Sequence, residues 1–350
     1  MTKEILIKNV KIGGGNKIAV QSMTNTKTHD IDKTVKQILD LEKAGCDIVR
    51  VAVPEIKDAK SVKEIIKQIN IPLCCDIHFD YKLALMCIEN GAHKIRFNPG
   101  NIGSKENIQR LVLLAKERNV PIRIGVNSGS IEKEFLNKNL SAHAALFESA
   151  LKHVRILEDL NFDKIVLSVK SSSVIDTVKA YRELHSKCNY PLHLGITESG
   201  FDLTGTVKSS IGIGSLLLDG IGDTIRVSLT DNPVNEVIVG KEILRALKKD
   251  TDYCEIISCP TCSRCEIDLQ KISRKVKDIT NDIKRPLKIA VMGCAVNGLG
   301  EAKDCDLGIA GAKEKSVIFK GGKVLKTVNS EILLDEFIIE LKKVLKEKEN

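Results

Sequence analysis

The sequence predicts a (β/α)8 barrel followed by a smaller α/β domain, and three observations support this fold class. Short β-branched, apolar runs recur at nearly regular intervals between residues 18 and 230. These runs are continuously apolar, as expected of parallel strands that are buried on both faces. Amphipathic helical stretches separate them, and eight strand–helix repeats are typical of a (β/α)8 barrel. A doubly wound open sheet is the alternative, but no Gly-x-Gly-x-x-Gly segment follows the first strand.

The expected elements follow from this periodicity in chain order. The barrel strands are expected at 18–23, 47–53, 73–77, 94–97, 122–126, 164–169, 192–197 and 224–229. A helix should begin after Asp30, and another should cover 59–69. Beyond the barrel we expect a helix at about 266–284, a strand at 287–292, further strands around 306–310 and 316–328, and a final helix at about 331–347.

A polar stretch, Lys248-Lys249-Asp250-Thr251-Asp252, separates the last barrel helix from the C-terminal elements. We therefore expect a barrel domain over residues 1–250 and a second domain over 251–350. A chain of 350 residues with 43% hydrophobic side chains is large enough for two cores.

Composition also excludes several functions. Tryptophan is absent and aromatic residues make up only 3%, so stacking surfaces for single-stranded nucleic acid are scarce despite a net charge of +8. The first residues lack a targeting pattern, and no apolar run approaches the ~20 residues that span a bilayer. We expect a cytoplasmic protein that binds neither nucleic acid nor membranes.

The eleven cysteines point to a metal centre rather than to disulfides, because their number is odd and the chain lacks a secretion signal. Cys259-Pro260-Thr261-Cys262 places two sulfurs on one turn, and Cys294 lies in a glycine-rich segment that continues to Glu301. Such a pattern is typical of an iron-sulfur cluster. Structural zinc is the alternative, and the spacing alone leaves both open.

Reactive side chains follow the expected strands, at the end where (β/α)8 barrels carry their active sites. They are Gln21, Ser22, Thr24, Asn25, Arg50, Asp76, His78, Arg96, Asn98, Arg123, Asn127, Lys170, Glu198, Arg226 and Ser228. Because like charges repel, lysine and arginine from five strands imply a polyanion between them. One guanidinium group can donate two hydrogen bonds to the oxygens of a phosphate, so a diphosphate is the expected ligand.

Three of these side chains are candidates for proton transfer. Asp76 and Glu198 lie among the cations, where each is either an acid/base group or a member of a structural ion pair. His78 is either a proton shuttle or a hydrogen-bonded scaffold residue. The segment 209–215, SSIGIGS, is either an anion-binding turn ahead of a helix or a simple helix start.

The chain resembles the bacterial 4-hydroxy-3-methylbut-2-enyl diphosphate synthases of the methylerythritol phosphate route to isoprenoids. The resemblance covers nearly the whole chain. It is carried by residues 21–26 (QSMTNT), 48–51 (IVRV), 76–79 (DIHF), 94–101 (KIRFNPGN), 121–127 (PIRIGVN), 195–198 (GITE), 222–228 (GDTIRVS) and 259–262 (CPTC).

This resemblance implies a TIM barrel followed by a domain that is similar to a sulfite-reductase module and carries a 4Fe-4S cluster. It implies an oxidoreductase that opens the ring of 2-C-methyl-D-erythritol 2,4-cyclodiphosphate with loss of water, using electrons from reduced flavodoxin or ferredoxin. It also implies a head-to-tail homodimer, because a short linker can hardly return the cluster domain to the mouth of its own barrel.

Site roles follow from the same resemblance. Its diphosphate-holding positions fall on Arg50, Arg96, Arg123, Lys170, Arg226 and Ser228, and its acid/base position falls on Glu198. Its cluster ligands fall on Cys259, Cys262, Cys294 and Glu301. Leu299 stands where the family usually has proline, and Ser263 and Cys265 replace the more usual Gly-Arg sequel to Cys262. Cys265 and Cys305 are therefore rival ligands to Glu301.

Two other functions remain as alternatives. One is a phosphate-ligand or RNA-binding barrel protein whose cysteines hold structural zinc. The other is a barrel enzyme of the pteroate-synthase type with an added scaffold domain, which would leave Cys294 and Glu301 without a role.

Overall fold

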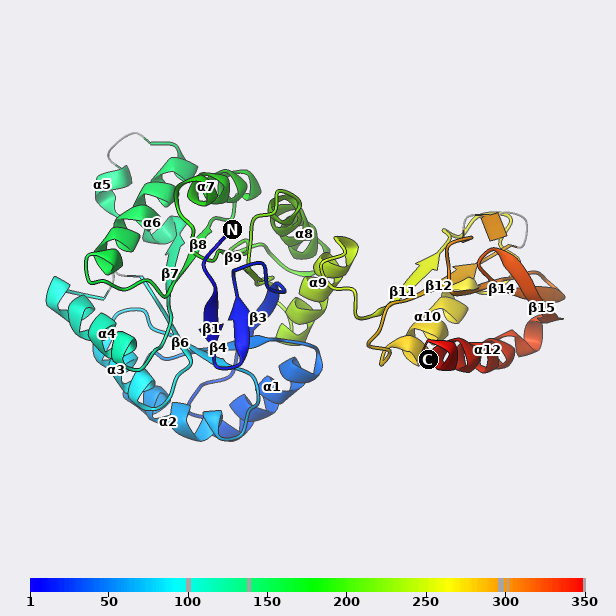
Figure 1. Ribbon diagram of the computed structural model, residues 1–350, viewed down its shortest axis with the longest axis horizontal. Helices are drawn as coiled ribbons and strands as arrows, with labels where there is room; N and C mark the ends of the chain where they lie inside the picture. The colour runs from blue at the N-terminus through cyan, green and yellow to red at the C-terminus, as the bar shows by residue number, and fades with distance from the viewer. Residues whose placement is uncertain (99–101, 137–139, 295–298, 301, 349–350) are drawn as a thin grey trace. The chain divides into compact units, whose positions relative to one another are not determined.

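The computed structural model describes residues 1–98, 102–136, 140–294, 299–300 and 302–348 (Figure 1). The chain divides into two compact units, Met1–Lys249 and Asp250–Asn350. Within the described ranges, none of the helices has the length and apolar character needed to cross a membrane.

Parallel strands of the first unit close into a barrel. They are β3 (Ala19–Met23), β4 (Ile48–Ala52), β5 (Leu73–Asp76), β6 (Lys94–Phe97), β7 (Ile122–Asn127), β8 (Ile165–Lys170), β9 (His193–Leu194) and β10 (Thr224–Ile225). From β3 to β8 each strand pairs with the next one in the chain, β9 pairs with β10, and β10 pairs with β3. A bridge between Leu167 and Leu192 joins β8 to β9 and completes the ring. The predicted fold class is confirmed.

Helices cover the outside of this barrel (Figure 1). They are α1 (Ile31–Lys43), α2 (Ile56–Ile66), α3 (Tyr81–Glu89), α4 (Lys105–Glu117), α6 (Ala142–Glu158), α7 (Val174–Lys187), α8 (Asp202–Leu218) and α9 (Pro233–Ala246), with the short α5 (Lys133–Leu136) ahead of α6. Asp30 caps α1 as expected, by accepting a hydrogen bond from the Lys33 backbone. The helix expected at 59–69 begins earlier, because Glu55 and Asp58 form a capping box.

Alternation along each strand separates the core from the barrel interior. On β6, Ile95 and Phe97 are fully buried in the apolar cluster that includes the helices. Lys94 and Arg96 therefore face the inside of the barrel. The antiparallel hairpin of β1 (Ile5–Ile7) and β2 (Val10–Ile12) packs on residues at the starts of the strands, so it covers that end of the barrel. The carboxyl ends of the strands remain as the open mouth.

The second unit is a mixed sheet. Its strands, in spatial order, are β11 (Cys254–Ser258), β12 (Leu287–Met292), β13 (Leu307–Ala310), β14 (Lys315–Lys320) and β15 (Lys323–Asn329). β11, β12 and β13 pair in parallel. β14 pairs antiparallel with β13, and β15 pairs antiparallel with β14. Helices α10 (Leu269–Thr280) and α12 (Leu333–Glu347) share one apolar cluster, so both pack on one face of this sheet (Figure 1).

The elements of this unit differ from expectation in three ways. The run 316–328 forms two strands rather than one, because Gly321 and Gly322 adopt positive φ and turn the chain. The helix expected at 266–284 is shorter, since Asp268 caps its start. Strand β11, whose residues are half-exposed at the sheet edge, lay outside the expected elements.

Candidate active site at the barrel mouth and the cysteine-bearing sheet edge

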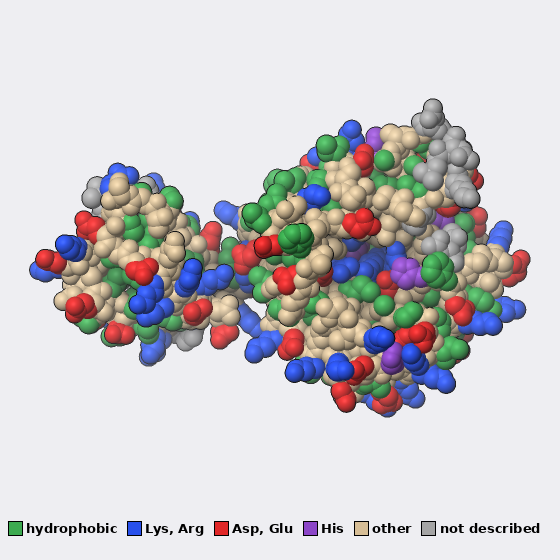
Figure 2. Space-filling view, turned by 180° about the vertical axis from the view of Figure 1, so that it is seen from behind, with side chains coloured by type: hydrophobic (Ala, Val, Ile, Leu, Met, Phe, Trp, Pro, Cys, Tyr) green, Lys and Arg blue, Asp and Glu red, His purple; other side chains and the backbone are tan. Residues whose placement is uncertain are grey.

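Cationic side chains from successive strands converge at the mouth of the barrel. Arg50 comes from β4, Arg96 from β6, Arg123 from β7 and Lys170 from β8, while Arg226 directly follows β10. Arg96 and Arg123 are register partners on adjacent strands. Figure 2 shows lysine and arginine side chains inside a hollow on this face of the barrel.

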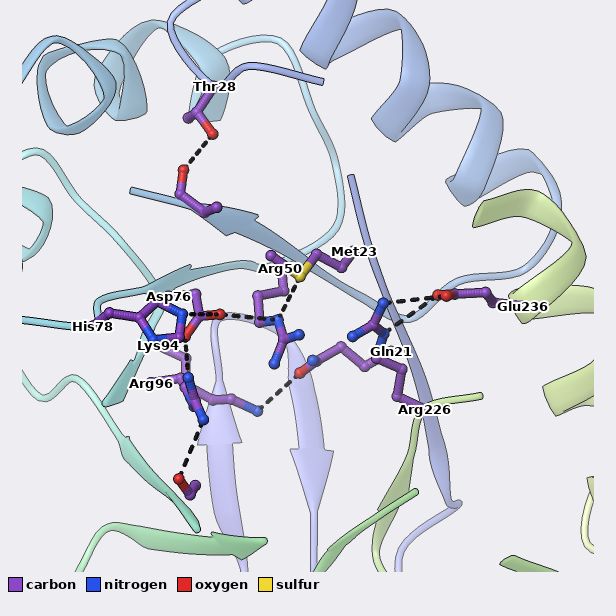
Figure 3. A network of polar contacts seen from close by, with 12 residues as sticks. Gln21, Met23, Thr28, Arg50, Asp76, His78, Lys94, Arg96, Arg226 and Glu236 are labelled. Atoms are coloured by element: carbon purple, nitrogen blue, oxygen red, sulfur yellow. Dashed lines mark hydrogen bonds and ion pairs between the residues drawn. The ribbon is translucent and has the colours of Figure 1, made fainter. Parts of the chain in front are cut away.

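Asp76 at the end of β5 links three of the surrounding groups (Figure 3). Its Oδ1 accepts a hydrogen bond from Arg96 Nη1 at 2.9 Å. Its Oδ2 lies 3.7 Å from Arg50 Nε and 3.6 Å from His78 Nε2. Burial raises the pKa of Asp76, but the Arg50 charge and the contact with His78 lower it more, so the pKa lies well below its usual value. The carboxylate is ionised.

Glu236 compensates a second cation, although it lies on a helix. This glutamate in the first turn of α9 is 4% exposed. Its carboxylate oxygens lie 3.2 and 3.3 Å from nitrogens of Arg226, and it also accepts a hydrogen bond from Ser22 Oγ at 2.9 Å. Sequence reasoning missed Glu236, because an acidic residue at the start of a helix usually faces solvent and interacts with the helix dipole.

The remaining cations have few partners in the described part of the chain. Arg123 is 1% exposed, and its Nε and Nη1 lack a hydrogen-bond partner there, as does Nε of Arg96. Burial lowers the pKa of Lys170, and repulsion from the neighbouring arginines lowers it further. Arg50 Nε donates to the sulfur of Met23, a weak acceptor. Buried donors without protein partners are typical of sites that bind water or an anion.

A cavity of about 220 Å³ opens among these groups. Its lining residues are Ile77, His78, Arg96, Asn98, Asn127, Ser128, Gly129 and Glu198. Five of them, namely His78, Arg96, Asn98, Asn127 and Glu198, belong to the candidate set that the sequence indicates. The cavity therefore combines a guanidinium, amides and potential proton donors in one place.

Glu198 has an unusual backbone conformation. Its φ is +51°, in the left-handed region that side-chain-bearing residues rarely adopt. The turn is held in place because Ser199 Oγ donates to the carbonyl of Ser228 and the Thr230 backbone donates to Gly200 O at 3.2 Å. Strain that the surroundings maintain in this way clusters at functional sites.

Two glycines make room for the cations. A Cβ at Gly125 would come within 2.5 Å of Arg96 Nε, and a Cβ at Gly195 would come within 2.5 Å of Lys170 Nζ. These positions are restricted to glycine by the side chains above them rather than by backbone angles. Both were missed as site residues, since the sequence signal of such contacts is only a glycine inside or directly after a strand.

The structure thus places the barrel residues that the sequence indicates at one end of the barrel. Ser228 is half-buried there, and its carbonyl holds Ser199. Gln21 and Ser22 are buried deeper inside. Both interpretations of 209–215, as a turn ahead of a helix and as a helix start, were wrong, because α8 begins at Asp202 and this segment lies inside it.

The cysteine motif occupies one edge of the second sheet. Cys259 directly follows β11, and Gly293 and Cys294 directly follow β12. These strands are parallel neighbours, with Ser258 opposite Val291, so the two cysteines leave the sheet at the same edge. The backbone N–H of Gly293 donates to Cys259 Sγ at 3.2 Å. Hydrogen bonds of this type to sulfur tune iron-sulfur clusters.

Cys262 and the two rival cysteines differ in their surroundings. Cys262 is exposed, and hydrogen bonds from the backbone and side chain of Arg264 lower the pKa of its thiol. Cys265 is half-buried against Gly293 and donates to the Ile267 carbonyl at 3.3 Å. Cys305 is buried in an apolar cluster with Met292.

Glu301, the expected fourth ligand, lies outside the described residues. Among those that are described, no three histidine, cysteine or carboxylate side chains stand close enough to form a single-ion site.

Fold and site together define the class of protein: a (β/α)8-barrel enzyme with a cationic mouth and an appended cysteine-bearing domain. Comparison with known families refines this. The model of the GcpE TIM-barrel domain matches residues 2–241, and that of the GcpE protein C-terminal domain matches residues 255–343. The chain therefore belongs to the GcpE family.

Relatives with assigned functions share most of this sequence. A protein of Caldanaerobacter subterraneus subsp. tengcongensis is 60% identical, over 99% of this chain and 98% of its own length. A protein of Fusobacterium nucleatum is 54% identical, over 99% of this chain and 97% of its own. Both are named 4-hydroxy-3-methylbut-2-en-1-yl diphosphate synthase (flavodoxin). These relatives confirm the resemblance that the sequence motifs indicate.

Among solved structures, the dihydropteroate synthase of Yersinia pestis superimposes with a TM-score of 0.51, covering 71% of this chain and 99% of its own. The two are 12% identical, so the likeness concerns the barrel fold alone.

Proposed function

We propose that the chain opens the ring of 2-C-methyl-D-erythritol 2,4-cyclodiphosphate reductively to give 4-hydroxy-3-methylbut-2-enyl diphosphate. The conversion takes up two electrons and two protons and releases one water, so it requires an anion site, a proton donor and a source of electrons. The observation that carries the proposal is the convergence of Arg50, Arg96, Arg123, Lys170 and Arg226 on one mouth. The identity to synthases of this product supports it.

In this proposal the barrel mouth holds the diphosphate. Arg123 and Lys170 are buried cations, and two nitrogens of Arg123 lack a partner among the described residues, so phosphate oxygens would satisfy donors that are otherwise desolvated. Asn98 and Asn127 line the cavity together with Arg96 and can hydrogen-bond the ester oxygens. Asp76 orients Arg96 and Arg50 through its ionised carboxylate.

The departing hydroxyl takes up a proton to leave as water and no new C–H bond forms, so the proton donor must reach oxygen atoms of a substrate held in the cavity. Glu198 and His78 both line it, and His78 is half-exposed. Asp76 remains an acid/base candidate, but its pKa, held well below the usual value, favours the role of an orienting group. Glu198 is then the proton donor, since its strained turn fixes the carboxyl at the cavity.

A 4Fe-4S cluster in the second domain would be held by Cys259, Cys262, Cys294 and Glu301. The thiol chemistry fits: Cys259 and Cys294 share one sheet edge, Gly293 supplies an N–H to sulfur, and Arg264 favours the thiolate of Cys262. When bound, the cluster supplies electrons to the substrate. A carboxylate ligand at Glu301 would leave one iron with an exchangeable oxygen position, which a fourth thiolate would close.

The fourth ligand can be tested spectroscopically. Glu301→Ala should retain a cluster on three thiolates with altered Mössbauer or EPR spectra and poor turnover, whereas Glu301→Cys should hold a stable but nearly inactive cluster. Wild-type spectra in Glu301→Ala, together with a changed spectrum in Cys265→Ser, would assign the ligand to Cys265 instead. Cys305 is the weaker rival because it is buried among apolar side chains.

The electron donor in this proposal is a reduced flavodoxin, with ferredoxin as the alternative. The relatives carry flavodoxin in their names. Reduced flavodoxin and reduced ferredoxin, each supplied as the only reductant, should be compared by turnover rate. A higher rate with ferredoxin would reverse the choice.

A homodimer is proposed for the active assembly. The outer side of α8 exposes a stripe of apolar side chains at helical spacing, Leu203, Val207, Ile211 and Leu218, each between 45% and 76% exposed. Exposed apolar surface of this extent marks an interaction site. A second copy is the occupant that would bring a cluster to each mouth in a head-to-tail pair.

Subunit complementation tests the dimer. Glu198→Gln removes the proposed proton donor of the mouth and Cys294→Ser disables the cluster, so each homodimer should be nearly inactive. Co-expression of the two chains should restore activity if each mouth works with the partner's cluster, because the mixed dimer then holds one intact pair. Inactive mixed dimers would show that mouth and cluster belong to one chain. Ile211→Glu should lower the molar mass in light scattering.

Titration calorimetry tests the anion site. The cyclodiphosphate should bind the anaerobically purified protein, and added inorganic diphosphate should compete. Metal analysis in the same sample should find iron and sulfide. Zinc without iron, or no binding of the cyclodiphosphate, would contradict the proposed function.

A further inference from the structure

Lys94 lies inside the barrel, beneath the mouth. Its side chain is fully buried. It opens β6 two residues before Arg96, so both side chains face the barrel interior. Its Nζ donates to Gln21 Oε1 at 3.3 Å (Figure 3). Gln21 belongs to β3, and β4 and β5 separate that strand from β6 in the barrel, so Lys94 reaches across the interior.

This ammonium is not compensated by a carboxylate in the described part of the chain. Its one hydrogen-bond partner there is the neutral Gln21. Burying a charge without an ion partner is unfavourable by several kcal/mol. Nearby donors show the same lack: Gln21 Nε2 and Arg123 Nε and Nη1 have no partner among the described residues. The interior beneath the mouth therefore has an excess of donors and positive charge.

The titratable groups around Lys94 come from most of the barrel strands. They are Arg50 on β4, Cys74 and Asp76 on β5, Arg96 on β6, Arg123 on β7, Lys170 on β8, His193 on β9 and Arg226 after β10 with its partner Glu236 on α9. Burial lowers the pKa of Lys94 to about 8, and repulsion from Arg123 and Arg50 acts in the same direction. Lys94 is thus partly neutral near physiological pH while the mouth is empty.

We propose that Lys94 is a positioning residue for the diphosphate, whose negative charge compensates the ammonium that no protein carboxylate neutralises. Lys94 adds positive charge beneath Arg96 and Arg123 and holds Gln21 across the barrel. This inference rests on the proposed function, because it requires an anion in the mouth. It assigns a role to a residue that does not line the cavity itself.

Binding should therefore be linked to proton uptake. A bound anion raises the pKa of a nearby ammonium, so a Lys94 that is neutral in the free protein takes up a proton when the diphosphate binds. The affinity is greatest below the free pKa and falls as pH rises above it, by up to about tenfold per pH unit.

Calorimetry of cyclodiphosphate binding in two buffers of different ionisation enthalpy measures this uptake. The buried Lys170 should also take up a proton when an anion binds, because its pKa is lowered as well. At about pH 9 wild type should therefore take up more protons than Lys94→Met and Lys94→Gln, and both variants should bind about tenfold or more weakly at about pH 7. Lys94→Gln retains a hydrogen-bond donor without the charge. Lys60→Met, which removes an exposed charge from α2, is the matched control and should behave as wild type.

The outcomes separate the two proposals. Wild-type binding without proton uptake would overturn the role of Lys94 even if neither variant folds. Unchanged Kd and uptake in a folded Lys94 variant, with only the melting temperature altered, would assign Lys94 a purely structural role. If wild type fails to bind the cyclodiphosphate, the proposed function fails and the inference about Lys94 fails with it.

Discussion

Arg96 lies directly over the backbone of Gly125. Its Nη2 donates to the Gly125 carbonyl at 3.2 Å, and a Cβ at that position would come within 2.5 Å of its Nε. Because Gly125 on β7 has no side chain, the guanidinium of Arg96 on β6 can lie close to the β7 backbone. Asp76 on β5 fixes the same guanidinium from the other neighbouring strand.

Gly125→Ala should displace Arg96 without unfolding the protein. The methyl group meets only the end of a flexible side chain, so we expect a loss of stability of about 1–3 kcal/mol. Cyclodiphosphate binding should weaken about tenfold or more, because a charge-assisted hydrogen bond is worth about 1.5–3 kcal/mol. Gly214→Ala is the control, since nothing lies near a Cβ there. An unchanged Kd in Gly125→Ala would show that the position of Arg96 does not affect binding.

Asp76→Asn should destabilise the free protein by about 3–5 kcal/mol in urea unfolding, because it leaves Arg96 and Arg50 without their buried counter-charge. Inorganic diphosphate should restore part of this loss by binding only the folded state. Asp163→Asn breaks an exposed ion pair with Lys3 and should cost at most about 1 kcal/mol. Equal effects of the two changes would contradict the network.

The same carboxylate predicts a dependence on pH. The pKa of Asp76 is lowered in the folded protein, so its contribution to stability is present above the unfolded value of about 3.9 and is lost as pH falls through the folded value. Unfolding measured below about pH 4 should therefore show a shallower acid dependence in Asp76→Asn than in wild type.

Arg123→Lys should weaken cyclodiphosphate binding by about 1.5–3 kcal/mol, because a point charge cannot reproduce the paired hydrogen bonds of a guanidinium. Arg118→Lys, on the exposed end of α4, tests for a general effect of the exchange and should leave the Kd unchanged. A Kd for Arg123→Lys equal to that of wild type would place Arg123 outside the anion site.

Cys259→Ser, Cys262→Ser and Cys294→Ser should each abolish cluster assembly, because thiolates are the ligands that iron-sulfur clusters require. Iron and sulfide analysis of anaerobically purified protein measures this. Cys188→Ser, in the barrel, should retain full iron content. Full cluster occupancy in any of the first three variants would mean that the ligand set is wrong, with Cys265 the first replacement to test.

The fold could be predicted from the sequence because every barrel strand is an apolar run between helical repeats. The residues at which two of the strands end could not be predicted from the sequence. The runs 192–197 and 224–229 read as full strands, yet β9 and β10 hold two residues each. Beyond Leu194, the chain turns toward the mouth, where the Thr197 backbone donates to Ser171 instead.

The site divides in a similar way. Charged residues that end a strand or follow one, such as Lys170 and Glu198, could be found because parallel strands end at one face. Lys94 and Glu236 could not, since a lysine that opens a strand and a glutamate that opens a helix both resemble solvated termini. Only the closed barrel shows that both are buried beneath the mouth.

Anaerobic turnover is the most direct test of the central claim. Protein reconstituted with iron and sulfide should convert 2-C-methyl-D-erythritol 2,4-cyclodiphosphate to 4-hydroxy-3-methylbut-2-enyl diphosphate with dithionite as reductant, and it should release one product molecule for each pair of electrons consumed. Absence of this product from protein that contains the full complement of iron and sulfide and binds the cyclodiphosphate would contradict the account.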